Sequence, residues 1–270
     1  MQSTIVYERH EGPGDPVVLI HGIGHRRQAW AEVPQRLRAR GFDVYVVDLP
    51  GHGESPIPAS PDGYSMPSQA EQLERLFVGL DLERPHVVGN SLGGCLALEL
   101  AHRDAVRSAT VLSPAGFFPA WHLLNLGANL LFMKAGSHLP EALHRRLASF
   151  TWFRRLAFRS LYTHPENVTA QIAVEDTLNL RRAKGFWPHF LRGILLRFTK
   201  EIRVPTTVAW GDTDRLLLPS EARVARSRLP EATHVTLPDC GHCPQVDHPD
   251  LVVDVVVATI DRAGETLPAA

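Results

Sequence analysis

The fold is decided by residues 86–94, which read HVVGNSLGG. The first five residues predict a buried strand, and the last three predict the start of a helix at Leu92, so that Ser91 lies in the turn between them. A glycine-x-serine-x-glycine string occurs by chance in many chains, but in this context it is typical of a sharp turn that presents a nucleophilic serine. Side chains in place of Gly89 and Gly93 would collide with the neighbouring strand and helix.

On both sides of this stretch, apolar runs rich in valine and isoleucine alternate with amphipathic stretches. This pattern is typical of parallel strands joined by helices that cover the sheet. We expect strands at residues 5–8, 16–20, 43–48, 86–90, 109–113, 206–210 and 234–237, and helices that begin near Trp30, Pro67, Leu92, Ser220 and Pro249. The predicted fold class is therefore α/β, with a mostly parallel sheet flanked by helices.

The strand pattern stops between Phe117 and Arg203, where helical pieces are broken at glycines and prolines. We expect an inserted helical cap over residues 117–203 and one core domain formed by residues 1–116 and 204–270. The insertion carries 13 lysine and arginine residues against 5 aspartate and glutamate residues. Two interpretations stay open: solvated helix faces that contact an acidic body, or a basic lid that favours an acidic substrate or an anionic surface.

Composition excludes several classes of protein. A formal net charge of -1 gives no electrostatic footprint for nucleic acid. No run approaches 18 apolar residues, and the first 15 residues lack the pattern of a signal peptide, so we expect a cytoplasmic protein with no integral membrane segment. The 3 cysteines lack a disulfide framework spacing and fit a reducing compartment. The oligomeric state is not readable from these patterns.

A serine nucleophile needs a base within hydrogen-bond reach and an acid that orients the base. Asp214 follows the predicted strand 206–210, and His242 follows the last predicted strand. The carboxyl ends of parallel strands meet at one edge of a sheet, so we predict that Ser91, Asp214 and His242 form a catalytic triad. Asp212 is a rival for the acid, although it suits a turn that bonds its own backbone.

The oxyanion of a tetrahedral intermediate needs two fixed N–H donors. The N–H of Leu92 lies directly after the nucleophile at the start of a helix, and the N–H of Ile23 lies in the loop after the predicted strand 16–20. We therefore predict these two backbone groups as the oxyanion hole.

At these residues the chain resembles the α/β-hydrolase superfamily across nearly its whole length. The matching segments, in chain order, are HGIG at 21–24, DLPGHGES at 48–55, GNSLGG at 89–94, GDTD at 211–214 with Pro219, and Gly241-His242 with Pro249. The resemblance implies that Ser91 is the nucleophile of the nucleophile elbow, Asp214 the acid and His242 the base. It also implies that Ile23 and Leu92 are the oxyanion donors, and that the helical insertion is a cap that shapes substrate access.

Other chemistries fit the sequence less well. The segment Cys240-Gly241-His242-Cys243 has the CxxC spacing of a thioredoxin-like redox site, but it follows the last predicted strand and precedes Pro244, whereas such sites open a helix early in a small fold. Two cysteines and one histidine are too few for structural zinc, and we expect no metal. No GxGxxG string follows a strand, which excludes dinucleotide binding.

We therefore expect acyl transfer to water: a serine hydrolase that cleaves a carboxylic ester of a small to medium apolar substrate through an acyl-enzyme, without a cofactor. The substrate is a small molecule, and Phe117, Trp121 and Trp187 are the first candidates to line its pocket. Phe118 and Phe186 could line it too, and all five residues could equally form the core of the insertion.

Three alternatives stay open. Carbon-carbon bond hydrolases of the meta-cleavage-product type also combine a serine with a cap, which here offers Arg181 and Arg182 to a substrate carboxylate, but His25-Arg26 and Cys243 depart from the motifs of that group. Acyltransferases and perhydrolases use the same triad. A hydrolase-like binding protein without turnover typically lacks a member of the triad. Haloalkane dehalogenases and epoxide hydrolases of the superfamily carry an aspartate where this chain has Ser91.

Overall fold

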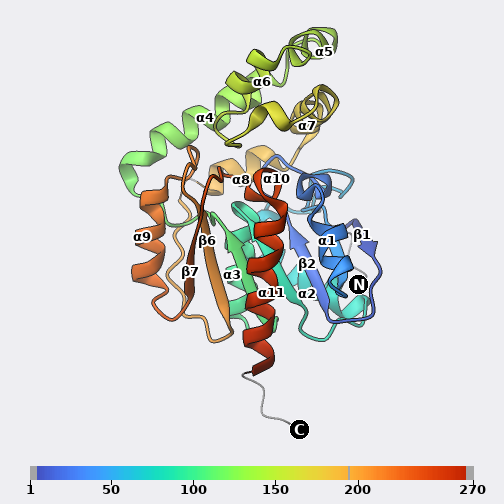
Figure 1. Ribbon diagram of the computed structural model, residues 1–270, viewed down its shortest axis with the longest axis vertical. Coiled ribbons are helices and arrows are strands. Elements are labelled where there is room, and N and C mark those ends of the chain that lie inside the picture. Colours follow the sequence, from blue (N-terminus) through green and yellow to red (C-terminus); the bar gives the residue numbers. More distant parts are fainter. Residues whose placement is uncertain (1–4, 194, 266–270) are drawn as a thin grey trace.

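A seven-stranded sheet forms the centre of the molecule in the computed structural model, which describes residues 5–193 and 195–265 (Figure 1). Its strand order is β1-β3-β2-β4-β5-β6-β7. The strands are β1 Tyr7–His10, β2 Pro16–Ile20, β3 Asp43–Val47, β4 His86–Asn90, β5 Ser108–Leu112, β6 Thr206–Gly211 and β7 Thr233–Leu237. Only β1 pairs antiparallel among these seven, and the predicted fold class is confirmed.

Helices join these strands. Those around the sheet are α1 Val33–Ala39, α2 Met66–Gly79, α3 Leu92–His102, α9 Pro219–Arg228, α10 Pro244–Asp247 and α11 Pro249–Glu265. Those between β5 and β6 are α4 Leu123–Gly136, α5 Glu141–Ala148, α6 Thr151–Ala157, α7 Ala170–Arg182 and α8 Phe186–Gly193. Single turns of 3₁₀ helix are η1 Arg27–Trp30, η2 Pro61–Tyr64, η3 Ala120–His122 and η4 Pro165–Asn167.

Local chemistry explains several helix starts. The hydroxyl of Ser65 accepts the N–H of Ser68 at 3.4 Å and Pro67 occupies the first turn of α2. The hydroxyl of Thr169 accepts the N–H of Ile172 at 3.2 Å at the start of α7. Both residues are N-caps that satisfy an N–H group which the helix leaves without a partner.

Two elements lie at positions that differ from those predicted from the sequence. The outer strand, expected at residues 5–8, lies at Tyr7–His10. The first helix, expected near Trp30, is a 3₁₀ turn that ends there, and α1 begins only at Val33. Ala31 has a φ of 49°, in the left-handed region, so the helical turn cannot continue through it. The predicted core domain also includes residues 1–4 and 266–270, which lie outside the described residues.

Alternating residues of the buried strands feed two separate hydrophobic cores. Val18 and Ile20 of β2 face one core, together with residues of α2, α3 and α9. Val17 and Leu19 face the other, together with residues of α1 and α11. The sheet is therefore covered on both faces, and Figure 1 shows α11 crossing its front. Burial on both faces accounts for the continuous apolar runs in the sequence.

The helical segment between β5 and β6 lies beyond the carboxyl ends of the strands, at the top of Figure 1. We refer to residues 117–203 as the cap. Its apolar helix α4 packs only in part: Leu126 and Leu130 contact buried clusters, whereas Leu124 and Phe132 are exposed. In the described part of the chain, none of the helices combines the length and apolar character needed to cross a bilayer.

The turn around Ser91 leaves no room for side chains on its two flanking glycines. A Cβ on Gly89 would lie 2.1 Å from the carbonyl oxygen of Gly93, and a Cβ on Gly93 would lie 2.2 Å from the carbonyl oxygen of Ile20. Both obstacles are backbone atoms, which cannot rotate out of the way. The close approach of α3 to β2 and β4 therefore requires glycine at both positions.

We predict that Gly93→Ala destabilises the protein by about 1–3 kcal/mol or more, because the added methyl group overlaps the backbone of β2. Urea unfolding measures the change. The matched control is Gly79→Ala at the end of α2, where an added Cβ meets nothing within 4 Å and the stability should stay equal or rise slightly. Equal stability of Gly93→Ala and wild type would contradict the packing described.

Candidate functional site

The three side chains predicted as a triad lie at one edge of the sheet. Ser91 follows β4, Asp214 follows β6 and His242 follows β7. All three are almost fully buried, and Ser91 and His242 line the same cavity. Parallel strands bring these loops together because their carboxyl ends share an edge.

Ser91 has a strained backbone that its neighbours hold in place. Its φ of 57° and ψ of -115° lie outside the regions that a serine normally adopts. Its N–H donates to the carbonyl of Leu112 at 2.9 Å, and its own carbonyl accepts the N–H groups of Cys95 at 3.1 Å and Ala115 at 2.9 Å. The strain persists because these hydrogen bonds fix the turn, an arrangement that is common at functional sites.

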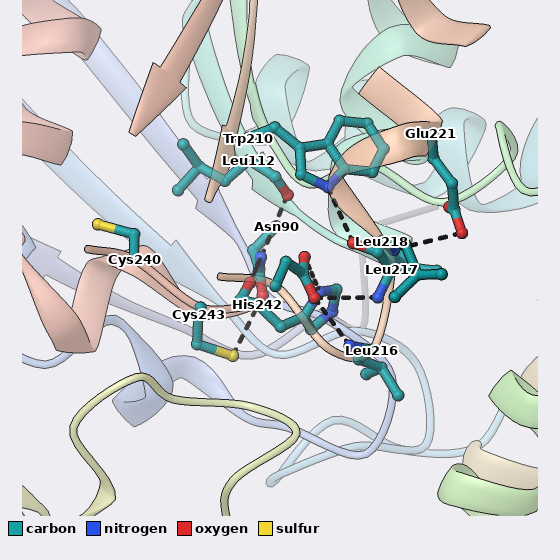
Figure 2. A network of polar contacts seen from close by, with 12 residues as sticks. Asn90, Leu112, Trp210, Leu216, Leu217, Leu218, Glu221, Cys240, His242 and Cys243 are labelled. Carbon is teal, nitrogen blue, oxygen red and sulfur yellow. Dashed lines mark hydrogen bonds and ion pairs between the residues drawn. The ribbon is translucent and has the colours of Figure 1, made fainter. Parts of the chain in front are cut away.

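His242 and Asp214 form a buried pair. The Nδ1 atom of His242 lies 2.9 Å from Oδ2 of Asp214, whose Oδ1 accepts the N–H groups of Leu216 at 2.9 Å and Leu217 at 3.0 Å (Figure 2). An ionised carboxylate only accepts hydrogen bonds, so Nδ1 of His242 is the donor in this pair and Nε2 is the ring nitrogen that Asp214 does not engage. The rival Asp212 is exposed.

Asn90 connects the serine turn to the histidine loop, a role that the sequence did not indicate. Its Nδ2 donates to the carbonyl of Leu112 at 3.1 Å and to the carbonyl of His242 at 2.9 Å (Figure 2). Gln245 donates to its Oδ1 at 3.4 Å. The position lies inside the glycine-serine-glycine string, but its partner is 152 residues away and a single sequence does not pair them.

The two predicted oxyanion donors lie beside Ser91. Ile23 and Leu92 line a small cavity together with Ser91, and a Cβ on Gly22 would lie 3.1 Å from the Cβ of Ser91. Among the hydrogen bonds of residues 5–193 and 195–265, none involves the N–H of Ile23 or of Leu92. Both groups are therefore available to a negatively charged oxygen.

His21 holds the loop that carries Ile23. The N–H of Leu49 donates to Nε2 of His21 at 3.0 Å, so the ring proton sits on Nδ1, which donates to the carbonyl of Gly22 at 2.7 Å. Burial lowers the pKa of His21, which keeps the ring neutral as this pattern requires.

Asp48 braces the same loop from its other end. Its side chain is fully buried, accepts the N–H groups of Arg27 at 2.7 Å and Glu54 at 2.9 Å, and forms an ion pair with the Arg27 guanidinium. From the cap, Asn179 Nδ2 donates to the carbonyl of Gly24 at 2.9 Å. The loop is thus fixed by the strand end, by the DLPGHGES segment and by helix α7.

Two cavities flank Ser91. The larger has a volume of about 230 Å³ and the smaller about 50 Å³, and most of the residues that line each of them belong to the cap. Residues of the body and the cap contribute together, with Leu130 lining both cavities. Asp176 is the acidic group of the larger cavity, and burial raises its pKa to about 6 despite Arg26 at 3.6 Å.

The three aromatic residues expected to line the pocket lie elsewhere. Phe117 has no exposed surface and packs in the core against Phe198. Trp121 is 67% exposed and Trp187 is 48% exposed, and neither lines the two cavities. Phe186 lines the larger cavity instead, and Phe118 the smaller. Successive residues of a helix point about 100° apart, so aromatic character alone does not tell which residue faces inward.

The cysteines beside His242 do not offer a reactive thiolate. Cys240 and Cys243 are free, buried thiols. Burial raises the pKa of Cys240 to about 12 and that of Cys243 well above its usual range. Disulfide exchange needs a thiolate in accessible, electropositive surroundings, so this environment does not support a redox site.

A buried glutamate and histidine hold the loop that follows Asp214. Glu221 Oε1 faces Nδ1 of His122 at 2.5 Å and accepts the N–H of Leu218 at 3.3 Å, at the far side of the loop in Figure 2. Burial raises the pKa of Glu221 to about 8 and lowers that of His122. At neutral pH, therefore, a protonated Glu221 donates to a neutral His122, which joins the first turn of the cap to α9.

We predict that Glu221 makes stability fall with rising pH. Its pKa is about 8 in the folded chain against 4.5 for a free side chain, so between these two values the folded state holds a proton that the unfolded state has lost. Stability then decreases until the folded pKa is passed and levels off above it. Glu221→Gln cannot titrate and should show a weaker decrease.

Thermal unfolding from about pH 7.5 to about pH 9 measures the upper part of this dependence, in a range where His122 is largely neutral in both states. Glu231→Gln, at an exposed glutamate, is the control and should follow the wild type. A Glu221→Gln curve parallel to that of wild type would contradict a buried neutral carboxyl group.

Comparison with known proteins agrees with this architecture. The family model described as alpha/beta hydrolase fold matches residues 15–249. The chain is 27% identical over 248 residues to Lipase 1 of Psychrobacter immobilis, covering 89% of this chain and 75% of the relative. It is 26% identical over 271 aligned positions to 2-hydroxy-6-oxo-6-(2'-aminophenyl)hexa-2,4-dienoic acid hydrolase of Metapseudomonas resinovorans, covering 96% and 88%.

Among solved structures, a thermophilic esterase from Thermogutta terrifontis has a TM-score of 0.73 and 23% identity, covering 96% of this chain and 93% of the esterase. The match to the family model begins just before β2 and ends at the start of α11, so it spans the strands β2 to β7 and the three loops of the site. The chain therefore belongs to the α/β-hydrolase fold family.

Proposed function

We propose that the chain is a serine hydrolase that cleaves a carboxylic ester of a small to medium apolar substrate. One observation carries the proposal: His242, whose Nδ1 lies 2.9 Å from the buried Asp214 carboxylate, lines the same cavity as Ser91 in its strained turn. A nucleophile, a base and an acid that orients the base are the groups that this chemistry requires.

In the first half of the reaction, Nε2 of His242 takes the hydroxyl proton of Ser91 while Oγ attacks the ester carbonyl. The carbonyl oxygen becomes an oxyanion and accepts the N–H groups of Ile23 and Leu92, each of which stabilises the transition state by about 2.7–4 kcal/mol. The imidazolium of His242, stabilised by the carboxylate of Asp214, then donates its proton to the departing alcohol. The product of this half is an acyl ester on Ser91.

In the second half, His242 takes a proton from water, which attacks the acyl ester of Ser91. The same two N–H groups hold the second oxyanion, and His242 returns the proton to Oγ as the carboxylic acid leaves. Every proton transfer involves side chains of the chain, the substrate or water.

The cavities support an ester with two apolar groups. An ester carbonyl carries one group on each side, and Ser91 lies between a cavity of about 230 Å³ and one of about 50 Å³, both mainly apolar. The similarity to a lipase and to an esterase supports the same class of bond.

A carbon-carbon bond hydrolase is the second candidate, favoured by the similarity to a dienoic acid hydrolase. Recognition of an acid substrate needs a cationic group near the serine. Arg181 instead donates to the carbonyl oxygens of Ser137 and Leu139, and the described residues that line the two cavities include no arginine or lysine. Ester hydrolysis is therefore better supported. Acyl transfer to another acceptor uses the same groups and differs only in what replaces water.

We predict that the wild type hydrolyses p-nitrophenyl esters with a burst of p-nitrophenol, because acylation of Ser91 releases the phenol before the acyl-enzyme is hydrolysed. Short to medium acyl chains should be preferred, since the larger cavity is about 230 Å³. Ser91→Ala should lower kcat by a factor on the order of 10⁶. Stopped-flow absorbance across a chain-length series measures both effects.

The matched control for Ser91→Ala is Ser137→Ala, since Ser137 lines the same cavity and its hydroxyl donates to the carbonyl of Lys134 at 2.7 Å within the cap. Its turnover should stay near that of wild type. No turnover of any ester by a folded wild type would refute ester hydrolysis and favour the carbon-carbon alternative.

We predict that Asp214→Asn lowers kcat by a factor on the order of 10⁴, because an amide no longer fixes the proton on Nδ1 of His242. Asp212→Asn, two residues away and exposed, should change kcat little. Steady-state kinetics on the best ester of the series makes the comparison. A large loss in Asp212→Asn with a small one in Asp214→Asn would reverse the assignment of the acid.

A further inference from the structure

Three potential metal ligands meet at the surface where the cap touches the histidine loop. His164 lies in the cap between α6 and η4, Asp239 lies after β7, and His248 lies between α10 and α11. Nε2 of His164 is 2.7 Å from Oδ2 of Asp239, and Nε2 of His248 is 3.7 Å from the same oxygen. The three donor atoms all lie within 4.8 Å of one another.

We propose that His164, Asp239 and His248 bind a divalent transition-metal ion such as Zn²⁺. Ligand atoms at about 2.0–2.2 Å from a tetrahedral zinc ion are about 3.3 Å apart. The two distances to Asp239 lie on either side of this value and the third separation is at most 4.8 Å, so the partly exposed side chains need only local adjustment to complete the site. Two imidazoles and one carboxylate favour zinc over Mg²⁺ or Ca²⁺, which prefer oxygen ligands.

A single carboxylate fixes the backbone around all three ligands. Asp247, which precedes His248, accepts the N–H groups of Thr163 at 3.0 Å, His164 at 3.2 Å and Gly241 at 2.8 Å. The cap segment that carries His164 is thus held against the loop that carries Asp239. Ligands whose backbone is already positioned lose less conformational freedom on metal binding, which favours a specific site over chance contacts at a surface.

The outer side of the site is also suited to a metal. Oε1 of Glu166 lies 3.9 Å from Nδ1 of His164, the ring nitrogen that would point away from the ion. A ligating imidazole commonly directs its other N–H to a carboxylate, which orients the ring. A bound ion would join the cap to the loop that carries His242, three positions after Asp239, and this inference does not depend on the reaction proposed for Ser91.

The experiment is a titration of the full chain, without a histidine tag and stripped of metal, with zinc chloride by isothermal titration calorimetry. Thermal unfolding with and without zinc accompanies it. We expect one zinc ion per chain and a higher unfolding temperature with zinc, because the ion binds only the folded arrangement. His164→Gln and His248→Gln should each weaken zinc binding by at least about tenfold. Neither magnesium chloride nor calcium chloride should raise the unfolding temperature of the wild type or of the two variants.

The matched control is His138→Gln, which removes an exposed histidine of the cap outside the cluster and should bind zinc like the wild type. Thermal unfolding in the absence of metal shows whether each variant is folded. If a histidine variant does not fold, Asp239→Asn replaces it in the titration. No binding by wild type would overturn the proposal. So would zinc affinity that is unchanged in the cluster variants, since the ion would then sit elsewhere, at His242 for example.

Discussion

The close packing of the α3 start against the backbone of β2 and β4 is the constraint on which the rest of the site depends. With glycines at 89 and 93, the helix begins very near the strands, and Ser91 takes a strained conformation directly before Leu92. The proposed nucleophile and one proposed oxyanion donor are therefore placed by the same backbone geometry. Their relative position is a property of the main chain and does not rely on flexible side chains.

The remaining groups are fastened to this turn by buried polar contacts. Asn90 bonds the carbonyl of His242, Asp214 bonds both the ring of His242 and the loop after itself, and Glu221 bonds the end of that loop. Each of these groups is buried, so breaking any contact would leave a polar atom without a partner, at a cost of about 1–3 kcal/mol. This free-energy cost keeps the polar groups in one arrangement before a substrate binds. Such preorganisation is the main requirement for the electrostatic stabilisation of an oxyanion.

Sequence patterns predicted the elements that local rules determine. Strands β2 and β4 have the bounds expected from apolar runs that end at turn residues, and the loops of Ser91, Asp214 and His242 meet because parallel strands end at one edge. Local rules failed where a single backbone angle intervened, as at Ala31 before α1. At the edge of the sheet, an apolar run alone does not fix where a strand pairs. Strand β1 therefore begins two residues later than expected.

Contacts between residues far apart in the chain could not be predicted from a single sequence. The pairs Asn90 with His242 and His122 with Glu221 are separated by 152 and 99 positions, and no spacing rule connects them. The prediction of the cavity-lining residues failed for another reason. Phe117, Trp121 and Trp187 share the chemistry of a pocket residue, but which side chains turn inward depends on how the cap sits on the body.

One hydrogen bond between cap and body affects how the protein can discriminate among substrates. The side chain of Asn179 in α7 donates to the carbonyl of Gly24, which follows Ile23, the residue whose N–H is proposed to donate to the oxyanion. In the proposed reaction, a molecule that fits poorly beneath α7 would displace this helix and, through the bond, the proposed donor. Selectivity would then appear in the rate of bond cleavage and not only in the affinity of the Michaelis complex, because the shape of a remote group is transmitted to the transition state.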